Sequence, residues 1–198
     1  MSAADEIDLV GRLRAGDNAA FAELVDKYHG AMLGVASTFV PTRAVAEEVV
    51  QETWLGVVRG IDRFEGRSSL KTWIFRILVN RARTAGVKEP RTVELDERGL
   101  VERERFGPGG AWVEPPSAWS DDADERLSAP VLAAKVRAAV DELPPSQRQV
   151  VTLRDVEGLS SVEVCKMLDL SEGNQRVLLH RGRARVRSAL ERQLGEAR

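Results

Sequence analysis

Apolar residues along the first 88 positions recur at the spacing of one face of a helix, and no strand-like alternation appears among them. The segment from Asn18 to Pro41 predicts one long helix, with Asn18 as its cap and Pro41 as its stop. Thr42 is expected to cap a further helix that runs to about Gly60. The buried stripe of that helix is expected to repeat every four residues, at Val49, Thr53, Val57 and Ile61. This half of the chain is therefore predicted to be entirely helical.

A glycine-containing loop and another helix follow. The loop at residues 62–69 ends in two serines, one of which is expected to cap the helix that begins at Leu70. Within this helix we expect Phe75 and Leu78 to lie in the core. The pattern leaves the place of Trp73 open, because an aromatic side chain suits both a core and a nucleic-acid surface.

The composition changes over residues 89–130, where prolines and acidic residues gather. This segment holds five prolines and the run GPGG, which disfavour regular structure. We expect a long flexible linker here, mostly extended. Trp112 and Trp119 are unusual in a linker and could anchor it on a partner or on a folded domain.

Helical spacing returns after the linker. One apolar stripe is expected at Val131, Leu132, Val136, Val140 and Leu143. The Pro144–Pro145 pair begins the next predicted helix, which ends near Gly158. The predicted fold class is therefore all-α, with two small helical domains, at residues 1–88 and 131–198, joined by the linker.

Two short helices with a tight joint are predicted within residues 159–187. Ser160 and Glu163 have the spacing of a capping box, in which each residue's side chain binds the other's backbone N–H group. Ser171 is expected to cap the second helix, after a turn at Asp169 and Leu170. This is the arrangement of a helix-turn-helix, whose second helix enters the major groove of DNA.

The second of these helices is basic on its outer face, and no acidic residue occurs between Gly173 and Leu190. Its expected inward stripe is Leu179, Gly182, Val186 and Leu190. Its expected outward positions are Asn174, Arg176, Val177, His180 and Arg181. Asparagine and arginine reach base edges, and arginine also neutralises phosphate, which favours DNA binding. An ordinary solvated basic face is the alternative.

Composition narrows the possible functions. The formal net charge is −2, so any binding of nucleic acid must come from local patches. The single cysteine, Cys165, excludes an internal disulfide and a cysteine-cluster metal site, and its apolar neighbours favour a buried, inert thiol. His29 and His180 are far apart in the sequence, and no glycine-rich phosphate loop appears. We therefore expect no metal, no cofactor and no enzymatic activity.

The cellular location follows from two features of the sequence. The N-terminus is acidic and lacks the basic and then apolar pattern of a signal peptide. The longest apolar-looking run, at residues 31–40, is shorter than the roughly 20 residues that span a bilayer. A cytoplasmic protein without membrane insertion is expected.

Basic and aromatic side chains are interleaved over residues 63–91. This stretch contains eight basic and two acidic residues, with Phe64, Trp73 and Phe75 among them. Such a mixture suits single-stranded nucleic acid, which needs neutralisation of its backbone and stacking of its bases. The apolar members also fit a core.

A second helix carries a polar, acidic face, in the sequence AEEVVQETWL at residues 46–55. The members of this face are Glu48, Gln51, Glu52 and Leu55, at helical spacing. Such a face suits docking on a basic partner. On spacing alone, an ordinary solvated helix face is the simpler explanation.

The order of these motifs resembles the extracytoplasmic-function (ECF) subgroup of bacterial RNA polymerase sigma factors. The resemblance is carried by AEEVVQETWL (46–55), FEGRSSLKTWIFRILVNRAR (64–83), ELPPSQRQVVTLRDVEGLSSVEV (142–164) and SEGNQRVLLHRGRARVR (171–187), with residues 21–28. It covers nearly all of the chain except the linker and the extreme ends. The resemblance implies a protein that binds core RNA polymerase, directs it to promoter DNA, and catalyses no bond chemistry itself.

The resemblance also implies a role for particular residues. Docking on the polymerase is implied for Glu48, Gln51, Glu52 and Leu55. Contact with the minus-ten element, read as a single strand, is implied for Phe64, Arg67, Ser68, Ser69, Lys71, Trp73, Arg76, Asn80 and Arg83. Contact with the minus-thirty-five element in the major groove is implied for Ser171, Asn174, Arg176, Val177, His180 and Arg181. An anti-sigma factor is a further implied partner.

The sequence departs from the family pattern in the second helix of the helix-turn-helix. Gln175 stands where the family usually has an apolar residue, and Val177 and Leu178 stand where polar or basic residues are usual. The rotation of this helix is therefore open. The alternative function is a stand-alone helix-turn-helix regulator, which would need neither the 64–83 stretch nor a docking helix.

Overall fold

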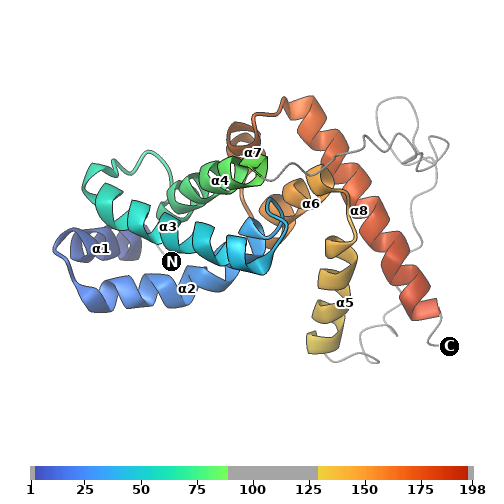
Figure 1. Ribbon diagram of the computed structural model, residues 1–198, viewed down its shortest axis with the longest axis horizontal. Helices are drawn as coiled ribbons and strands as arrows, with labels where there is room; N and C mark the ends of the chain where they lie inside the picture. Colours follow the sequence, from blue (N-terminus) through green and yellow to red (C-terminus); the bar gives the residue numbers. More distant parts are fainter. Residues whose placement is uncertain (1–2, 89–128, 196–198) are drawn as a thin grey trace. The chain divides into compact units, whose positions relative to one another are not determined.

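The computed structural model describes residues 3–88 and 129–195, and every regular element within them is helical. The first range contains α1 (Ala3–Arg14), α2 (Asn18–Ala36), α3 (Arg43–Gly60), the 3₁₀ turn η1 (Ile61–Arg63) and α4 (Leu70–Lys88). The second contains α5 (Ala129–Asp141), α6 (Pro145–Val151), the π-helical turn η4 (Thr152–Val156), α7 (Ser161–Leu168) and α8 (Glu172–Gly195) (Figure 1). The predicted all-α class is confirmed. Residues 89–128 of the expected linker, including Trp112 and Trp119, lie outside the described residues.

Close contacts divide the chain into two compact units. One unit contains α1 to α4 together with residues 144–179. The other contains α5 and the part of α8 that begins at His180. The expected division into domains at 1–88 and 131–198 remains a prediction.

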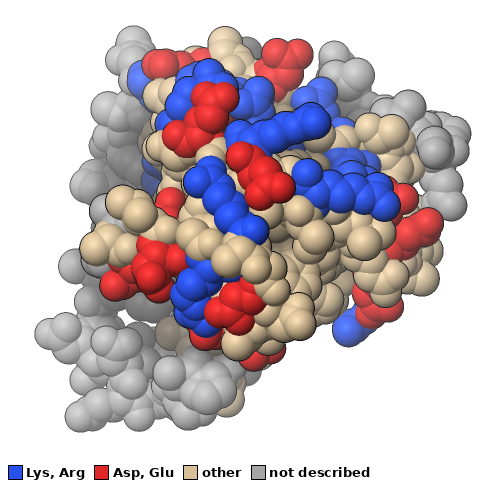
Figure 2. All heavy atoms as spheres, turned by 90° about the vertical axis from the view of Figure 1, so that its left-hand side faces the viewer, with Lys and Arg blue, Asp and Glu red and all other residues tan. Residues whose placement is uncertain are grey.

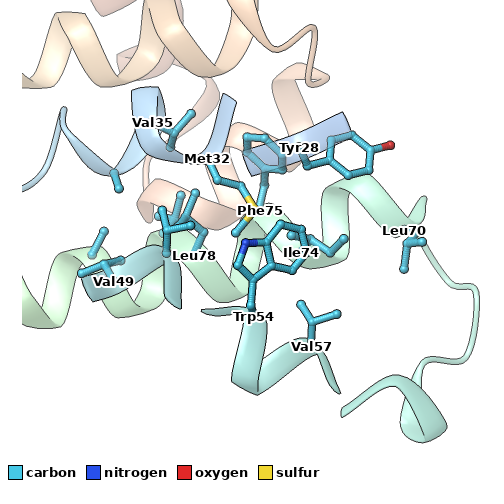
Figure 3. Close-up of a cluster of buried hydrophobic side chains, with 14 of the residues drawn as sticks. Tyr28, Met32, Val35, Val49, Trp54, Val57, Leu70, Ile74, Phe75 and Leu78 are labelled. Atoms are coloured by element: carbon cyan, nitrogen blue, oxygen red, sulfur yellow. The ribbon is translucent and has the colours of Figure 1, made fainter. Parts of the chain in front are cut away.

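The core of the first unit is centred on α4, which packs against α2 and α3 (Figure 3). Phe75 and Leu78 are fully buried, as predicted. The ring of Tyr28 meets that of Phe75 edge to face, with 6.3 Å between the ring centroids. The expected stripe of α3 is also confirmed, because Val49, Thr53, Val57 and Ile61 are all buried. Each large apolar side chain buried in this way stabilises the fold by about 1.5–3 kcal/mol.

Local hydrogen bonds begin these helices, and one of the predicted caps is wrong. The Thr42 side chain accepts the Val45 N–H at the start of α3, as expected. At the start of α2 the cap is Asp17, not Asn18. Asp17 has extended backbone angles, and its carboxylate accepts the N–H groups of the second and third residues of the helix, at 2.8 and 3.3 Å. A carboxylate suits this position better than an amide, because its charge also complements the helix dipole.

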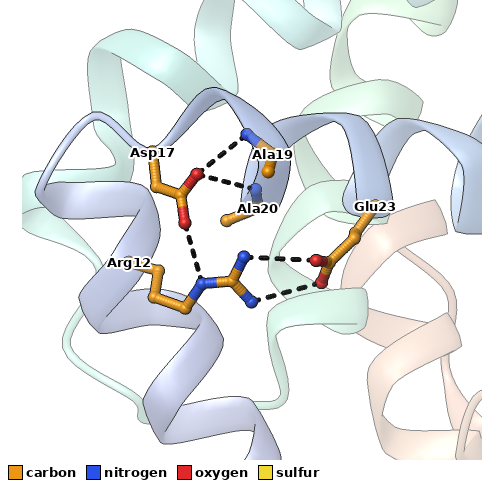
Figure 4. A network of polar contacts seen from close by, with 5 residues as sticks. All are labelled: Arg12, Asp17, Ala19, Ala20 and Glu23. Carbon is orange, nitrogen blue, oxygen red and sulfur yellow. Dashed lines mark hydrogen bonds and ion pairs between the residues drawn. The ribbon is translucent and has the colours of Figure 1, made fainter.

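The same carboxylate ties α1 to α2 through Arg12 (Figure 4). The Nε of Arg12 lies 2.9 Å from Asp17, and its two terminal nitrogens reach the Glu23 carboxylate at 3.1 and 3.3 Å. The Arg12 hydrogen bond holds the pKa of Asp17 below its usual value of 3.8, with help from the N–H groups of Ala20 and Ala19. The turn between the two helices is therefore closed by one guanidinium between two carboxylates.

The predicted helix-turn-helix forms from α7 and α8. Ser160 and Glu163 make the expected capping box, and Ser171 accepts the Asn174 N–H at 3.2 Å. Between the helices Asp169 adopts a left-handed conformation, with φ at 58°. Cys165 is half-buried rather than buried. Val164 and Met167 form the buried face of α7. Cys165 follows Val164 directly, so its side chain lies about 100° around the helix from that of Val164 and is only partly covered.

In the second unit, α5 packs beside α8. The buried residues are Ala139, Val140 and Leu143 from α5 and the turn after it, and Ala189 and Leu190 from α8. The stripe expected along α5 is confirmed at its end, where Val140 and Leu143 are buried, but it is wrong at Val131, which is 44% exposed. Val131 stands in the first turn of α5, at the end away from the buried pair.

Candidate nucleic-acid interface

The loop between η1 and α4 carries the first of the residues expected to meet the minus-ten strand. Phe64 is only 6% exposed, and its ring packs at a tilt on that of Trp73, with 5.3 Å between the centroids. At the exposed tip Arg67 and Glu65 form an ion pair of 2.9 Å. Gly66 lies between them with φ at 69°, a left-handed conformation that favours glycine. The loop thus presents a polar tip on an aromatic base.

A hollow of about 560 Å³ lies beside this loop. Five of the nine predicted minus-ten residues line it: Phe64, Arg67, Ser68, Trp73 and Arg76. Its wall also includes Thr72 of α4 and Glu163, Lys166 and Met167 of α7. The structure therefore brings aromatic, hydroxyl and guanidinium groups around one space. This mixture allows an unpaired base to stack and to form hydrogen bonds.

Ser69, another predicted minus-ten residue, stabilises the start of α4. Its hydroxyl accepts the N–H of Thr72 at 3.1 Å, so Ser69 caps α4, as one of the two serines was expected to do. The two hydroxyl oxygens also lie 2.8 Å apart. A cap at this point fixes where the loop ends and the helix begins.

Lys71 and Arg83 contact the segment that leads into α7 and forms it. Lys71 Nζ lies 3.0 Å from the Glu157 carboxylate and donates to the Glu157 carbonyl oxygen at 2.7 Å. Arg83 donates to the carbonyl oxygen of Met167 at 3.3 Å. All four residues belong to the same compact unit. A nucleic-acid strand that reached these two cations would have to displace their protein partners.

Glu163 also links α7 to α4. Thr72 Oγ1 donates to Glu163 Oε1 at 2.7 Å, while the N–H and hydroxyl of Ser160 donate to the other carboxylate oxygen at 2.8 and 2.7 Å. Burial by itself raises the pKa of Glu163, but the hydrogen bonds from Ser160 and Thr72 outweigh it and leave the pKa below its usual value. The Glu163 side chain in this wall is therefore ionised at neutral pH.

Asn80 lines a different space from the residues of the hollow. A groove of about 590 Å³ runs between α3 and α4, and its walls include Asn80, Glu48 and Glu52. Arg81 Nη1 lies 2.8 Å from the Glu52 carboxylate. The structure thus brings one predicted DNA contact together with two predicted polymerase contacts, a grouping that the sequence did not indicate.

The predicted docking face of α3 is open to solvent. All four of its members are exposed: Glu48, Gln51, Glu52 and Leu55. Leu55 is 55% exposed, and Val58, one turn further along α3 and also 55% exposed, adds a second apolar side chain beside this face. Exposure meets the first requirement of docking, and the role itself remains a prediction.

Helix α8 presents the predicted major-groove residues to solvent. The residues at its start and along its outer face are all exposed: Ser171, Asn174, Arg176, Val177, His180 and Arg181. Its inward stripe is confirmed, with Leu179, Gly182 and Leu190 buried and Val186 half-buried. Gln175 is 3% exposed, and its Oε1 accepts a hydrogen bond from Ser161 at 3.0 Å. The open question of rotation is thereby answered, because Gln175 points inward and Val177 outward.

Charges are mixed on the side of the molecule shown in Figure 2. Lys and Arg side chains gather across its upper half, and Asp and Glu side chains lie among them. Arg63, Arg67 and Arg76 are exposed around the hollow, and Glu65 is exposed beside them. Attraction for DNA must therefore come from particular groups, as the net charge of −2 implied.

Nothing in the sequence pattern indicated that α1 belongs to this site. Arg14 binds backbone carbonyl oxygens 47 and 50 positions further along the chain, and Glu6 binds a backbone N–H 64 positions away. No local pattern reveals a contact over such separations. Only the fold brings these side chains to the loop.

Other kinds of site find no support within the residues that the structure describes. They contain no group of three or more His, Cys, Asp or Glu side chains placed to hold a metal ion. Among the helices of the same residues, none combines the length and the apolar character that crossing a membrane needs.

Two family models match the chain. The model of Sigma-70 region 2 matches residues 24–89, and that of Sigma-70, region 4 matches residues 133–186. The ECF RNA polymerase sigma-E factor of Escherichia coli (strain K12) is 32% identical over 178 residues, which is 90% of each chain. The RNA polymerase sigma-H factor of Pseudomonas aeruginosa is 31% identical over 189 residues, covering 96% of this chain and 95% of that protein.

Two solved structures have a similar fold. CnrH, in complex with the cytosolic domain of CnrY, matches with a TM-score of 0.57 at 21% identity, over 94% of this chain and 97% of that one. The sigma factor RpoE of Bartonella quintana, in complex with the anti-sigma factor NepR, matches with a TM-score of 0.56 at 22% identity, over 86% and 96%.

Proposed function

Because the chain belongs to the ECF sigma factors of bacterial RNA polymerase, we propose that each of its surfaces has a separate task in initiation. As a sigma factor, it binds core RNA polymerase and directs promoter-specific transcription. Sigma factors are initiation factors rather than enzymes. A stand-alone regulator is disfavoured, because the chain matches region 2 as well as region 4.

The minus-ten strand is proposed to bind at the hollow beside the 62–69 loop. The observation that carries this proposal is the convergence of Phe64, Trp73, Arg67 and Arg76 on one space. Flipping a base out of a duplex costs a few kcal/mol, and stacking with hydrogen bonds in a pocket can offset that cost. The exposed arginines supply the neutralisation of phosphate that such a strand needs.

Asn80 is proposed to contact the same strand from the neighbouring groove. The variant Asn80→Ala tests this role, since open-complex formation should fall while binding of duplex minus-thirty-five DNA persists. Glu48 and Glu52, two proposed polymerase contacts, line the same groove, so docking on the polymerase is the competing role for Asn80. Loss of affinity for core polymerase in Asn80→Ala, with normal melting by the assembled holoenzyme, would assign Asn80 to docking instead.

Recognition of the minus-thirty-five element is proposed for the outer face of α8. Asn174, Arg176, His180 and Arg181 lie exposed on one basic helix that follows the turn at Asp169. These side-chain types pair with base edges and phosphates in the major groove. Docking of α3 on the polymerase then holds both DNA-binding surfaces near one promoter. Making the second contact intramolecular raises avidity by about 10²–10⁴.

A proteinaceous inhibitor is proposed as a further partner. The solved structure of RpoE contains the anti-sigma factor NepR, and CnrH is bound to the cytosolic domain of CnrY. An anti-sigma factor for this chain would have to cover the docking face or the DNA-binding surfaces. We also propose that the protein acts in the cytoplasm, where its polymerase and DNA are found.

Transcription in vitro with core polymerase tests the proposed function. Purified protein and core enzyme are combined with a library of genomic promoters, and the transcripts are sequenced. The expected result is a set of start sites that share minus-ten and minus-thirty-five elements and that core enzyme alone does not use. Unchanged start sites, or failure to join core enzyme, would contradict the proposal.

A further inference from the structure

Helix α1 contacts both ends of the loop that carries the proposed minus-ten residues. The Nε of Arg14 donates to the carbonyl oxygen of Ile61 at 3.3 Å, and its Nη2 donates to the carbonyl oxygen of Phe64. Two turns earlier on the same helix, Glu6 Oε1 accepts the N–H of Leu70 at 2.7 Å. The loop is therefore connected to α1 near both of its ends, by Arg14 at one end and by Glu6 at the other.

Glu6 satisfies a backbone group that the start of a helix leaves unpaired, and Arg14 adds charged donors to two carbonyl oxygens at η1. Leu70 is the first residue of α4, so its N–H has no carbonyl partner within the helix, and a carboxylate there also complements the helix dipole. Arg14 reaches the carbonyl oxygen of Phe64, the residue that caps the end of η1, where a cation is the complementary group. It also reaches the carbonyl oxygen of Ile61, the first residue of η1, which accepts the Phe64 N–H as well, at 3.1 Å. Hydrogen bonds to charged groups are shorter and stronger than neutral ones.

The tip of the loop is less constrained than its base, where Phe64 packs on Trp73. Its tip is exposed and turns at Gly66, a residue whose backbone has more freedom than any other. Fixing the two ends restricts the conformations available between them, and a site formed in advance binds without a further ordering cost. The Phe64–Trp73 contact, which makes the aromatic base of the hollow, lies next to the Arg14 contact in the chain.

We propose that Arg14 and Glu6 are positioning residues for the minus-ten strand. Helix α1 holds the 62–69 loop at the residues that flank it, so that the hollow has its binding shape before DNA arrives. Neither side chain touches DNA in this arrangement; each acts through the loop backbone. This inference rests on the proposed function, because it requires the loop to meet the unpaired strand.

A matched control lies on the same helix. Arg12 binds Asp17 and Glu23, which belong to the junction of α1 with α2 and not to the loop. Arg12→Ala therefore removes charge-assisted contacts of α1 without touching residues 61–70. If α1 served the site only by packing on the domain, Arg12→Ala and Arg14→Ala would have the same effect.

The experiment measures binding of the full holoenzyme to a forked promoter. Core polymerase is assembled with the parent, Arg14→Ala, Glu6→Gln or Arg12→Ala, on a promoter that the parent transcribes. The fork exposes the non-template minus-ten strand, and an abasic site is moved through it one position at a time. For the parent we expect one or more positions where the abasic site weakens binding sharply, because a captured base is missing.

We expect the affinity that the Arg14 and Glu6 variants lose to depend on whether the captured base is present. Arg14→Ala should bind the intact fork about tenfold more weakly, the size of one lost hydrogen bond to a charged group. Glu6→Gln keeps an oxygen acceptor for the Leu70 N–H but loses the charge, so its affinity should fall less. Arg14→Ala should lose little further affinity at the sensitive abasic position, because the effects of groups that act together are not additive. Glu6→Gln should be less sensitive to the abasic site than the parent. Arg14→Lys, which keeps one donor, should recover part of the affinity. Arg12→Ala should keep the parent's abasic profile.

Two outcomes would overturn the inference. One is the parent's full abasic sensitivity in both Arg14→Ala and Glu6→Gln. The other is an equal loss in Arg12→Ala. A parent that is insensitive at every position gives a different pattern; it refutes single-strand reading by the loop and this inference with it. Thermal unfolding identifies any variant that fails to fold, and Arg14→Lys and Glu6→Gln, which nearly keep side-chain size, then replace the alanine variant.

Discussion

The guanidinium of Arg81 lies 2.8 Å from the carboxylate of Glu52, which joins α4 to α3 across the groove that also contains Asn80. Gly56 makes room for this contact, because a Cβ at that position would stand 3.1 Å from Arg81 Nη2. One of the proposed polymerase contacts is therefore held in place by a side chain of the neighbouring helix.

Replacing Arg81 by alanine should weaken docking on core polymerase with little effect on stability. The two side chains are 36% and 53% exposed, and exposed ion pairs contribute only about 0–1 kcal/mol to the free energy of unfolding. Affinity for core polymerase should fall several-fold, because Glu52 loses the partner that orients it. Arg43→Ala is the control, since it breaks the exposed Arg43–Glu47 pair of the same helix outside the docking set. Equal affinities of both variants for core polymerase would contradict the role of Glu52.

Replacing Gly86 by alanine should destabilise the first unit. A Cβ at this position would stand 2.6 Å from the carbonyl oxygen of Phe39, a backbone atom that cannot move aside cheaply. Overpacking of this kind costs about 1–3 kcal/mol. Gly34→Ala in α2 is the matched control, because nothing lies within 4 Å of its Cβ, and it should instead gain about 0.5–1 kcal/mol. Urea unfolding of both variants measures the two changes.

Replacing Gln175 by leucine should stabilise the helix-turn-helix. The Gln175 Nε2 is buried and has no hydrogen-bond partner among the described residues. Removing a buried, unpaired polar group should raise the free energy of unfolding by about 1–3 kcal/mol, and the loss of the Ser161 hydrogen bond should lower it by about 0.5–1.5 kcal/mol. The expected net gain is about 1 kcal/mol. Gln149→Leu is the control, because its Nε2 donates to the Thr38 carbonyl oxygen at 3.3 Å, and this variant should lose stability. Denaturant titration of the two variants gives the sign of each change.

Asp17 should contribute to the loss of stability in acid. Its folded pKa lies below the usual 3.8, chiefly through the Arg12 hydrogen bond. Its contribution is therefore fully present above the unfolded pKa and is lost as pH falls through the lower, folded pKa. Asp17→Asn keeps an acceptor for capping but cannot titrate. The difference in melting temperature between parent and variant should be constant at neutral pH and shrink below about pH 4.

Arg176 should contribute to reading the minus-thirty-five element. Arg176→Ala should weaken promoter recognition by roughly 1–3 kcal/mol if the side chain meets a base, or lower the salt slope by about one if it meets phosphate. Gln175→Leu should leave promoter recognition unchanged, because that neighbouring side chain is buried. Binding of holoenzyme to promoter variants at several salt concentrations distinguishes the outcomes. An unaltered profile in Arg176→Ala would remove the residue from the interface.

Features whose partners lie within about four residues could be predicted from the sequence. The cap at Thr42, the capping box at Ser160 and the cap at Ser171 each pair groups three residues apart, so the pattern contains the whole interaction. The buried stripes of α3 and α8 follow in the same way from helical spacing. Even here the cap of α2 was misplaced by one residue, because Asp17 and Asn18 are both good caps and backbone angles decided between them.

The sequence by itself determined the helices, their order and the chemical types on their faces, because these depend on neighbours along the chain. Only the tertiary structure decided which of those faces meet. It separated Asn80 from the hollow, joined Arg81 to Glu52, and brought Arg14 and Glu6 to the ends of a loop far along the chain. Such contacts depend on how helices pack, and packing is set by side chains from several elements at once.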